Sequence, residues 1–207
     1  MGLIGTMSAL VLGLLVASAK SSYDAQRDEV SLLAARVGLL DRVLTQYGPE
    51  SKDIRNRLRA VVARGIDQLW QESRSPSPGF APEDPGGNVL YARIGELSPK
   101  NDTQRAFQQQ ASAIASEIAG VRLLMFAQKG SSISIPFLVV VVFWLTVNFV
   151  SFGLFAPPNA TALVTLFVCA VSVACAIFLI LEMDGPFQGL IQISDTPLRE
   201  ALERLGR

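Results

Sequence analysis

The sequence predicts an all-α membrane protein with three transmembrane helices and a helical bundle outside the membrane. Half of the 207 residues are apolar and only 17% are charged, which is less charge than soluble domains usually carry. Three stretches, at about residues 2–19, 133–155 and 160–181, contain no charged residue. Each reaches or approaches the roughly 20 helical residues that cross a hydrocarbon core about 30 Å thick. Because backbone polar groups must be paired in lipid, each stretch is expected to be a helix.

The distribution of charge predicts the topology. All 18 basic and all 18 acidic residues lie outside these stretches and outside the short connection at 156–159. If each stretch spans a bilayer, every charge lies on one side, and lysine and arginine mark that side as the cytoplasm. We therefore expect transmembrane helices at 1–19, 133–155 and 160–181, with the N-terminus outside. The cytoplasmic parts are then a helical bundle at 20–132 and a turn and helix at 182–207.

Two alternatives to this topology are weaker. A soluble protein with buried apolar helices would account for one such stretch, but three within 207 residues make it improbable. Ala17-Ser18-Ala19 resembles a signal-peptidase site. However, a signal peptide carries a basic residue before its apolar core, and this sequence has none there. The first stretch is therefore interpreted as a transmembrane helix.

Apolar periodicity predicts the helices of the bundle. Steps of three and four continue without a breaker from the first stretch to Gly48-Pro49, so the span is expected to run directly into a long helix. A second helix is expected after an N-cap at Ser51, followed by a Pro/Gly loop at 73–88, a short helix at about 89–97 and a long helix capped by Asn101 or Asp102. The second helix is basic. A solvated outer face is favoured there over contact with anionic lipid or guidance of anions.

Small residues form one stripe along the first span. They recur every four residues, at Gly5, Ala9, Gly13 and Ala17. This spacing is typical of close helix packing in membranes. It predicts tight packing within or between subunits, or a narrow axis lined by these residues.

The second span carries the only notable polar side chain at membrane depth. Asn148 shares a helical face with Trp144, Ser151 and Phe155. An amide in lipid needs a hydrogen-bond partner or water. A structural hydrogen bond between helices is favoured, and a pore-lining role for Asn148 and Ser151 is the alternative.

Two acids, Glu182 and Asp184, end the third span and precede a turn that contains Pro186 and Gly189. They are either interfacial charges at a helix stop or an acidic ring at the cytoplasmic mouth of a pore. Their position leaves both interpretations open.

No pattern indicates catalysis or cofactor binding. The chain contains no histidine, no metal-ligand spacing and no glycine-rich phosphate loop. Cys169 and Cys175 lie six apart in one span, cannot bridge within the helix and are interpreted as small apolar residues. A net charge of zero gives no electrostatic footprint for nucleic acid. We therefore expect no enzyme activity, no cofactor and no metal.

Five segments resemble a known family of bacterial membrane proteins, the bestrophin-like proteins. They are GLIGTMSALVLGLLVASAKSSYDAQRDE, LLDRVLTQYGPES, LYARIGELSPKNDTQR, FWLTVNFVSFGLFAPPNATA and AIFLILEMDGPFQGLIQISDTPLREAL. The last two are the most specific, because they combine rigid and polar residues at fixed spacing. Together the segments cover nearly the whole chain. The residues that carry the motif are Trp144, Pro186, Phe187, Gly189, Asp195, Pro197 and Leu198.

The resemblance implies a function that the residues alone do not. Bestrophins are pentameric ion channels, so it implies a homo-oligomeric pore for inorganic ions in the bacterial inner membrane, with a periplasmic N-terminus. Leu190-Ile191-Gln192 replaces the acidic cluster that binds calcium in animal bestrophins. A calcium site of that type is therefore not expected, because calcium takes six or more oxygen ligands. Glu182 and Asp184 would favour cations, whereas the basic second helix would favour anions, so the sequence leaves ion selectivity undetermined. A membrane-anchored helical scaffold without transport activity is the alternative.

Overall fold

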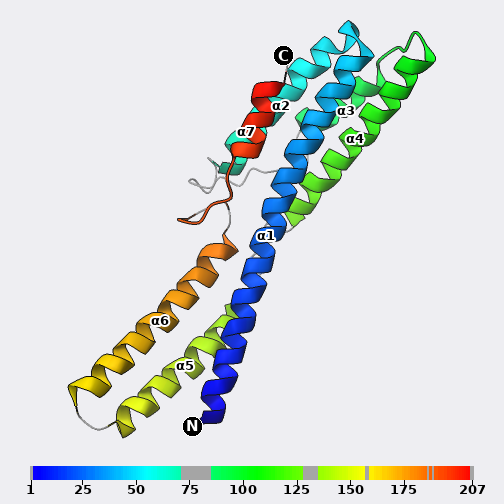
Figure 1. Ribbon diagram of the computed structural model, residues 1–207. Coiled ribbons are helices and arrows are strands. Elements are labelled where there is room, and N and C mark those ends of the chain that lie inside the picture. The colour runs from blue at the N-terminus through cyan, green and yellow to red at the C-terminus, as the bar shows by residue number, and fades with distance from the viewer. Residues whose placement is uncertain are drawn as a thin grey trace. The chain divides into compact units, whose positions relative to one another are not determined.

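The computed structural model describes residues 2–70, 85–127, 135–156, 159–185, 187 and 189–205. Every regular element over these residues is a helix (Figure 1). In chain order they are α1 (Gly2–Tyr47), the 3-10 turn η1 (Pro49–Ser51), α2 (Lys52–Trp70), α3 (Pro85–Gly95), α4 (Asp102–Ala127), α5 (Ile135–Phe155), α6 (Ala160–Asp184) and α7 (Thr196–Arg204). The predicted all-α class is confirmed for this part of the chain.

The chain divides into two compact units. One, here called the apolar unit, comprises Met1–Ala25 and Gly130–Ile191. The other, the bundle unit, comprises Gln26–Lys129 and Gln192–Arg207. The apolar unit contains all three uncharged stretches and extends past them to include Lys20, Asp24, Glu182 and Asp184.

Helix α1 is a single helix of 46 residues that contributes to both units. Its continuity agrees with the unbroken apolar periodicity of the sequence. It ends at Gly48, whose φ of 127° is a conformation that residues with a Cβ rarely adopt. A Cβ added at Gly48 would also stand only 2.9 Å from Oε2 of Glu50. Pro49 follows directly, so the chain turns sharply into α2.

The apolar unit packs the first part of α1 with α5 and α6. Its buried core consists of Leu15, Ala19, Val141 and Ile180, with partly buried neighbours Val11, Leu12, Leu138, Leu145 and Met183. Three helices are long and apolar enough to cross a membrane, within Gly5–Tyr47, Pro136–Phe155 and Ala160–Asp184. Only 17%, 11% and 6% of their most apolar windows are buried within the chain. The described chain therefore leaves most of the surface of these helices uncovered.

The bundle unit packs the second part of α1 with α2, α3, α4 and α7. Helices α1 and α4 run antiparallel, because Gln104 donates to the Tyr47 carbonyl at 3.0 Å while Arg36 pairs with Glu117 further along both helices. Helix α2 packs against α3 and α7, and α3 packs against α4. The apolar stripes bury Leu40 and Leu44 of α1 together with Leu58 of α2.

Of three local expectations, one is confirmed, one has the wrong boundary and one is wrong. Asn101 caps α4 as predicted, because its Oδ1 accepts from the Gln104 N–H at 2.7 Å. The expected loop at 73–88 is too long at its end, because residues 85–88 already belong to α3, and residues 71–84 lie outside the described residues. Ser51 is not the N-cap of α2. It lies in η1, and its hydroxyl donates backward to carbonyls of the preceding turn.

Candidate functional site

The small-residue stripe of α1 lies on the side of the helix that the chain leaves uncovered. Ala9, Gly13 and Ala17 are exposed and Gly5 is half-buried, whereas Ser8, Leu15 and Ala19 on the opposite side are buried. A Cβ added at Gly5 or Gly13 would meet no atom within 4 Å. The stripe therefore takes no part in packing within the described chain and remains available to lipid, to a second copy or to an axis.

The polar face of α5 satisfies itself. Asn148 is 8% exposed, and its Nδ2 donates to the Trp144 carbonyl one turn earlier at 2.9 Å. This differs from the favoured expectation of a bond between helices. Ser151 is half-buried, whereas Trp144 and Phe155 are 40% and 81% exposed, so this face is covered around Asn148 and exposed at its two ends. Whether Asn148 and Ser151 line a pore stays a prediction.

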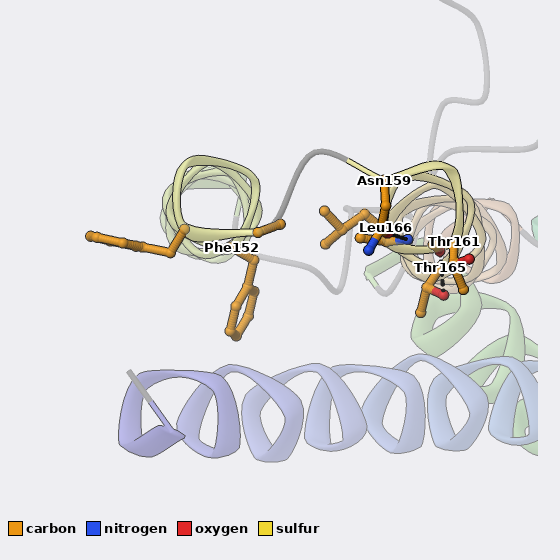
Figure 2. A pocket seen from close by; sticks show the side chains of 8 residues that line it. Phe152, Asn159, Thr161, Thr165 and Leu166 are labelled. Carbon is orange, nitrogen blue, oxygen red and sulfur yellow. Dashed lines mark hydrogen bonds between the residues drawn. The ribbon is translucent and has the colours of Figure 1, made fainter.

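A groove lies between α5 and α6 at the ends joined by their hairpin, and sequence reasoning did not anticipate it. Figure 2 shows Phe152 on one wall and Thr161, Thr165 and Leu166 on the other. Two of its polar groups are engaged within the chain, because the Thr165 hydroxyl donates to the Thr161 carbonyl and the Asn159 Oδ1 accepts from the Ala162 N–H. The groove has a volume of about 530 Å³ and an apolar character, with lining residues Phe152, Phe155, Ala156, Asn159, Thr161, Ala162, Thr165 and Leu166.

The two acids at the end of α6 are half-buried, and Glu182 is bound by the following turn. Its Oε1 accepts hydrogen bonds from the backbone N–H groups of Leu190 and Ile191, the second at 3.1 Å. Gly189 is exposed with a φ of 94°, and Phe187 is half-buried. Pro186 lies outside the described residues. The structure therefore gives Glu182 a bonded environment that the sequence pattern did not indicate.

The last part of the family motif begins α7. Asp195 precedes the helix and pairs with Arg199, whose pKa is raised by this hydrogen bond. Pro197 occupies the first turn, where its missing N–H costs nothing. Leu198 is buried, and Trp70 of α2 donates from its indole to the Ile193 carbonyl at 2.9 Å. These contacts hold the C-terminal segment against α2.

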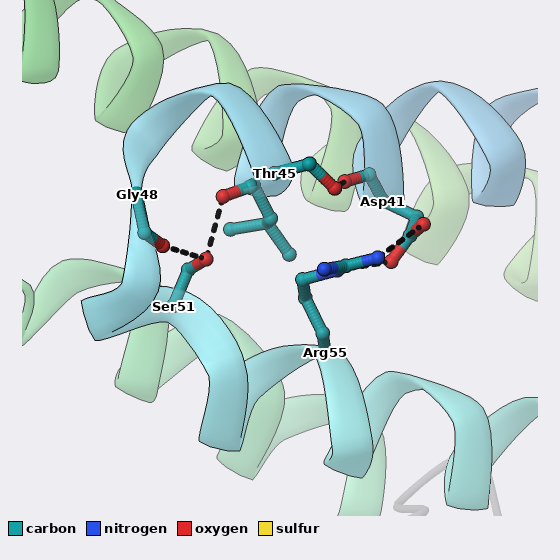
Figure 3. Close-up of polar contacts among 6 residues, drawn as sticks. Asp41, Thr45, Gly48, Ser51 and Arg55 are labelled. Carbon is teal, nitrogen blue, oxygen red and sulfur yellow. Dashed lines mark hydrogen bonds and ion pairs between the residues drawn. The ribbon is translucent and has the colours of Figure 1, made fainter. Parts of the chain in front are cut away.

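A polar network joins α1 to α2 at the turn of the bundle unit (Figure 3). The Arg55 guanidinium binds both carboxylate oxygens of Asp41, at 2.7 and 3.1 Å, and this bond raises the pKa of Arg55. The Ser51 hydroxyl contacts the carbonyls of Leu44 and Gly48 at 2.5 and 2.7 Å. The expectation of a solvated outer face for the basic residues of α2 is therefore wrong for Arg55, which serves an internal ion pair.

The described residues contain no group of three or more His, Cys, Asp or Glu side chains placed to hold a metal ion. Cys169 and Cys175 are exposed on α6 and form no disulfide. The arrangement thus offers apolar surfaces and turn-bound charges, and the residues singled out in the spans are candidates for conduction or packing.

Comparisons with known proteins identify this architecture. A family model described as the Bestrophin-like domain matches residues 1–198. Two crystal structures of a mutated bacterial bestrophin homologue from Klebsiella pneumoniae share the fold, with TM-scores of 0.74 and 0.73 and 16% identity. The match covers 100% of this chain and 87% of each crystallised chain. No curated protein matches the sequence.

Proposed function

Because the chain belongs to the bestrophin-like family, we propose that it forms an oligomeric ion channel in the bacterial inner membrane. The family match over residues 1–198 is the observation that carries this proposal, and the shared fold of the bacterial homologue supports it. The large exposed apolar surface of the membrane-length helices also supports the proposal, because at most 17% of each apolar window is buried within the chain. Lipid and neighbouring copies would cover the rest.

The α1 stripe is the part of the surface best suited to a narrow axis or to close contact between copies. Small residues let helices approach closely in lipid. Gly13 also has free space around it within the chain. A pentamer follows by analogy with bestrophins. The absence of charge from the three apolar stretches assigns ion selection to apolar constrictions, to Asn148 or to the cytoplasmic mouth.

The sidedness of the proposal follows from charge. The N-terminus is periplasmic, and the bundle unit with the basic residues of α7 is cytoplasmic. Asp184 stands at the cytoplasmic end of α6 and is a candidate charge at the mouth. No catalytic step, cofactor or nucleic-acid partner is part of the proposal.

Ion flux from reconstituted liposomes tests the proposal. We expect purified protein to carry flux and to migrate as a homo-oligomer in native mass spectrometry. Gly13→Val should reduce both the ion flux and the fraction of protein in the oligomer. The branched side chain would keep the helices of neighbouring copies from approaching closely at this position. Gly153→Val is the matched control, since Gly153 also lies exposed in a span with no atom within 4 Å of an added Cβ. Wild-type protein that carries no flux over a range of pH and voltage would reject the channel.

A scaffold function is the second candidate, and the bundle unit supplies the observation that favours it. Leu32 and Leu39 project from the same side of α1 one heptad apart, and both are exposed outside the apolar stretches. Such residues suit contact with another helix. A monomeric protein that lacks flux and yet is retained on a partner through Leu32 and Leu39 would support this reading over the channel.

A further inference from the structure

A side chain of α6 forms hydrogen bonds with the backbone of the segment that follows this helix. Glu182 lies in the last turn of α6, and its Oε1 accepts from two successive backbone N–H groups, those of Leu190 and Ile191. The two bonds close over sequence separations of eight and nine residues. Two adjacent N–H groups that converge on one oxygen form an anion-binding concavity of the kind known as a nest. Here the anion belongs to the chain.

Gly189 is the residue that permits this closure. Its φ of 94° is open to glycine and strained for other residues. A Cβ built at this position would collide with the Glu182 carboxylate, because it would lie too close to the carboxylate carbon and to both of its oxygens. The two residues are therefore complementary. The carboxylate occupies the space that the missing side chain leaves, and the backbone conformation at Gly189 turns the next two N–H groups towards it.

We propose that Glu182 is a positioning residue whose carboxylate holds the backbone at Leu190 and Ile191 against the end of α6, and that it is not a selectivity charge. Hydrogen bonds to an ionised acceptor are about twice as strong as neutral ones. Ile191 is the last residue of the apolar unit, and Ile193 accepts the indole of Trp70 two residues later. The carboxylate thus holds the backbone of the apolar unit up to its last residue.

The consequence for transport rests on the proposed channel function, whereas the closed connection does not. A carboxylate that already binds two N–H groups has part of its charge compensated locally. Neutralising it should therefore change the shape of the connection more than the charge experienced by a passing ion. This expected result distinguishes a positioning role for Glu182 from a role in an acidic ring at the pore mouth, because such a ring would act through its charge alone.

The side-chain chemistry predicts a graded response. Glutamine keeps an oxygen acceptor of the same reach and loses the charge, so it should hold the connection partly. Aspartate is one methylene shorter and should hold it less well. Alanine leaves both N–H groups without their acceptor. Glu203, an exposed residue of α7, provides the matched control for each change.

Hydrogen exchange followed by mass spectrometry on the full chain in nanodiscs tests the closure directly. We expect Glu182→Ala to speed the exchange of the Leu190 and Ile191 amides by roughly tenfold or more, as the loss of a charge-assisted bond predicts. Glu182→Gln should give an intermediate rate, and Glu203→Ala should leave these amides unchanged. Free formate should slow exchange again in Glu182→Ala relative to chloride at equal ionic strength. Unchanged exchange of both amides in Glu182→Ala would overturn the proposal.

Reversal potentials in liposomes distinguish the two roles and keep the channel hypothesis separate. We expect Glu182→Gln to lower the flux and to leave the reversal potential in an ion gradient unchanged. A shifted reversal potential with normal amide exchange would overturn the positioning role in favour of a mouth charge. Wild-type protein without flux would reject the channel, and the exchange experiment would still decide whether Glu182 closes the connection.

Discussion

The two units differ in where their polar side chains find hydrogen-bond partners. In α5 and α6 of the apolar unit, the side chains of Thr146, Asn148, Thr165 and Ser172 donate to carbonyls of their own helix one turn earlier. Glu182 at the end of α6 differs, because it accepts from backbone N–H groups beyond the helix. In the bundle unit polar groups also join residues that are distant in the chain. Arg55 binds Asp41, Trp70 binds Ile193 and Gln104 binds the Tyr47 carbonyl.

The difference fits the lipid surroundings proposed for the apolar unit. A polar group in lipid must be satisfied, and a carbonyl of its own helix is always within reach. Such a bond does not determine which helix lies beside it, so neighbours must be chosen by shape, as the uncovered stripe at Gly13 suggests. In the bundle unit a polar bond between elements also selects a register. We therefore expect substitutions of polar residues to affect stability strongly in the bundle unit and weakly in the apolar unit.

Asp41→Ala should have the largest effect. It leaves the Arg55 guanidinium without its partner in a largely buried position, since the two side chains are 17% and 12% exposed. Breaking a buried ion pair on one side costs about 3 kcal/mol. Denaturant titration of the full chain in detergent, followed by circular dichroism, measures the loss.

Two variants make this first prediction specific. Arg57→Ala removes an exposed pair with Asp53 and should leave the titration unchanged, because exposed pairs contribute little. Asp41→Ala combined with Arg55→Met should recover part of the loss, since no unpaired charge remains. An equal loss in Asp41→Ala and Arg57→Ala would contradict the strong coupling assigned to the bundle unit.

Trp70→Phe should have the next largest effect. It removes the indole N–H and leaves the Ile193 carbonyl without its donor, which costs about 1 kcal/mol. Amide exchange over residues 193–205 should rise, because this bond helps to hold the C-terminal segment on α2. Trp144→Phe is the control with the same change on the exposed face of α5. Identical exchange profiles for the two variants would show that α7 is held by Leu198 and its apolar neighbours alone.

Apolar periodicity was sufficient to predict the helices but not the polar contacts between them. Steps of three and four predicted the continuity of α1, and the change in charge predicted three apolar helices. Asp41 and Arg55 are 14 residues apart, and Trp70 and Ile193 are 123 apart. No local pattern specifies which of several acids and bases meet at such separations. Ser51 was misassigned for a related reason, because a hydroxyl beside a turn can cap forward or bond backward.

The residues of the candidate site were proposed from the sequence, and their roles stay predictions. Gly5, Ala9, Gly13 and Ala17 were found from spacing alone, and the structure places three of them on an uncovered face. Glu182 was found because acids are rare at the end of an apolar stretch. Its bonds to the N–H groups beyond Gly189 depend on a backbone turn, which composition does not encode. The glycine itself, at the end of a Pro/Gly-containing turn, was the only signal that could have suggested a close approach.

Tyr47→Phe should act in the opposite direction. Tyr47 is only 3% exposed, and its buried hydroxyl has no hydrogen-bond partner among the described residues. Removing an unsatisfied buried hydroxyl should stabilise the bundle unit by up to about 1 kcal/mol. The same denaturant titration detects it. Tyr91→Phe, at an exposed position of α3, is the control and should change nothing.

The pH dependence of Tyr47 gives this prediction a second measurement. Burial raises the pKa of the phenol above its ordinary value of 10.0, with a further rise from the charge of Glu50. The folded state then holds this proton more tightly than the unfolded state, so stability is fully present below pH 10 and falls as the pH rises through the folded pKa. Tyr47→Phe should remove that part of the alkaline loss. A wild-type alkaline profile retained in the variant would assign the loss to other groups.

Thr165→Val should have the smallest effect and compares the two units most directly. Its hydroxyl donates to the Thr161 carbonyl at 2.9 Å, which is already bonded within the helix, so the change should stay within about 0.5 kcal/mol. Thr45→Val removes the same kind of bond, to the Asp41 carbonyl at 2.8 Å, in the bundle unit and should behave alike. A loss confined to Thr165→Val that also weakens the oligomer in native mass spectrometry would mean that the hydroxyl serves a contact with another copy. The polar groups of the apolar unit would then also select neighbours, but between chains.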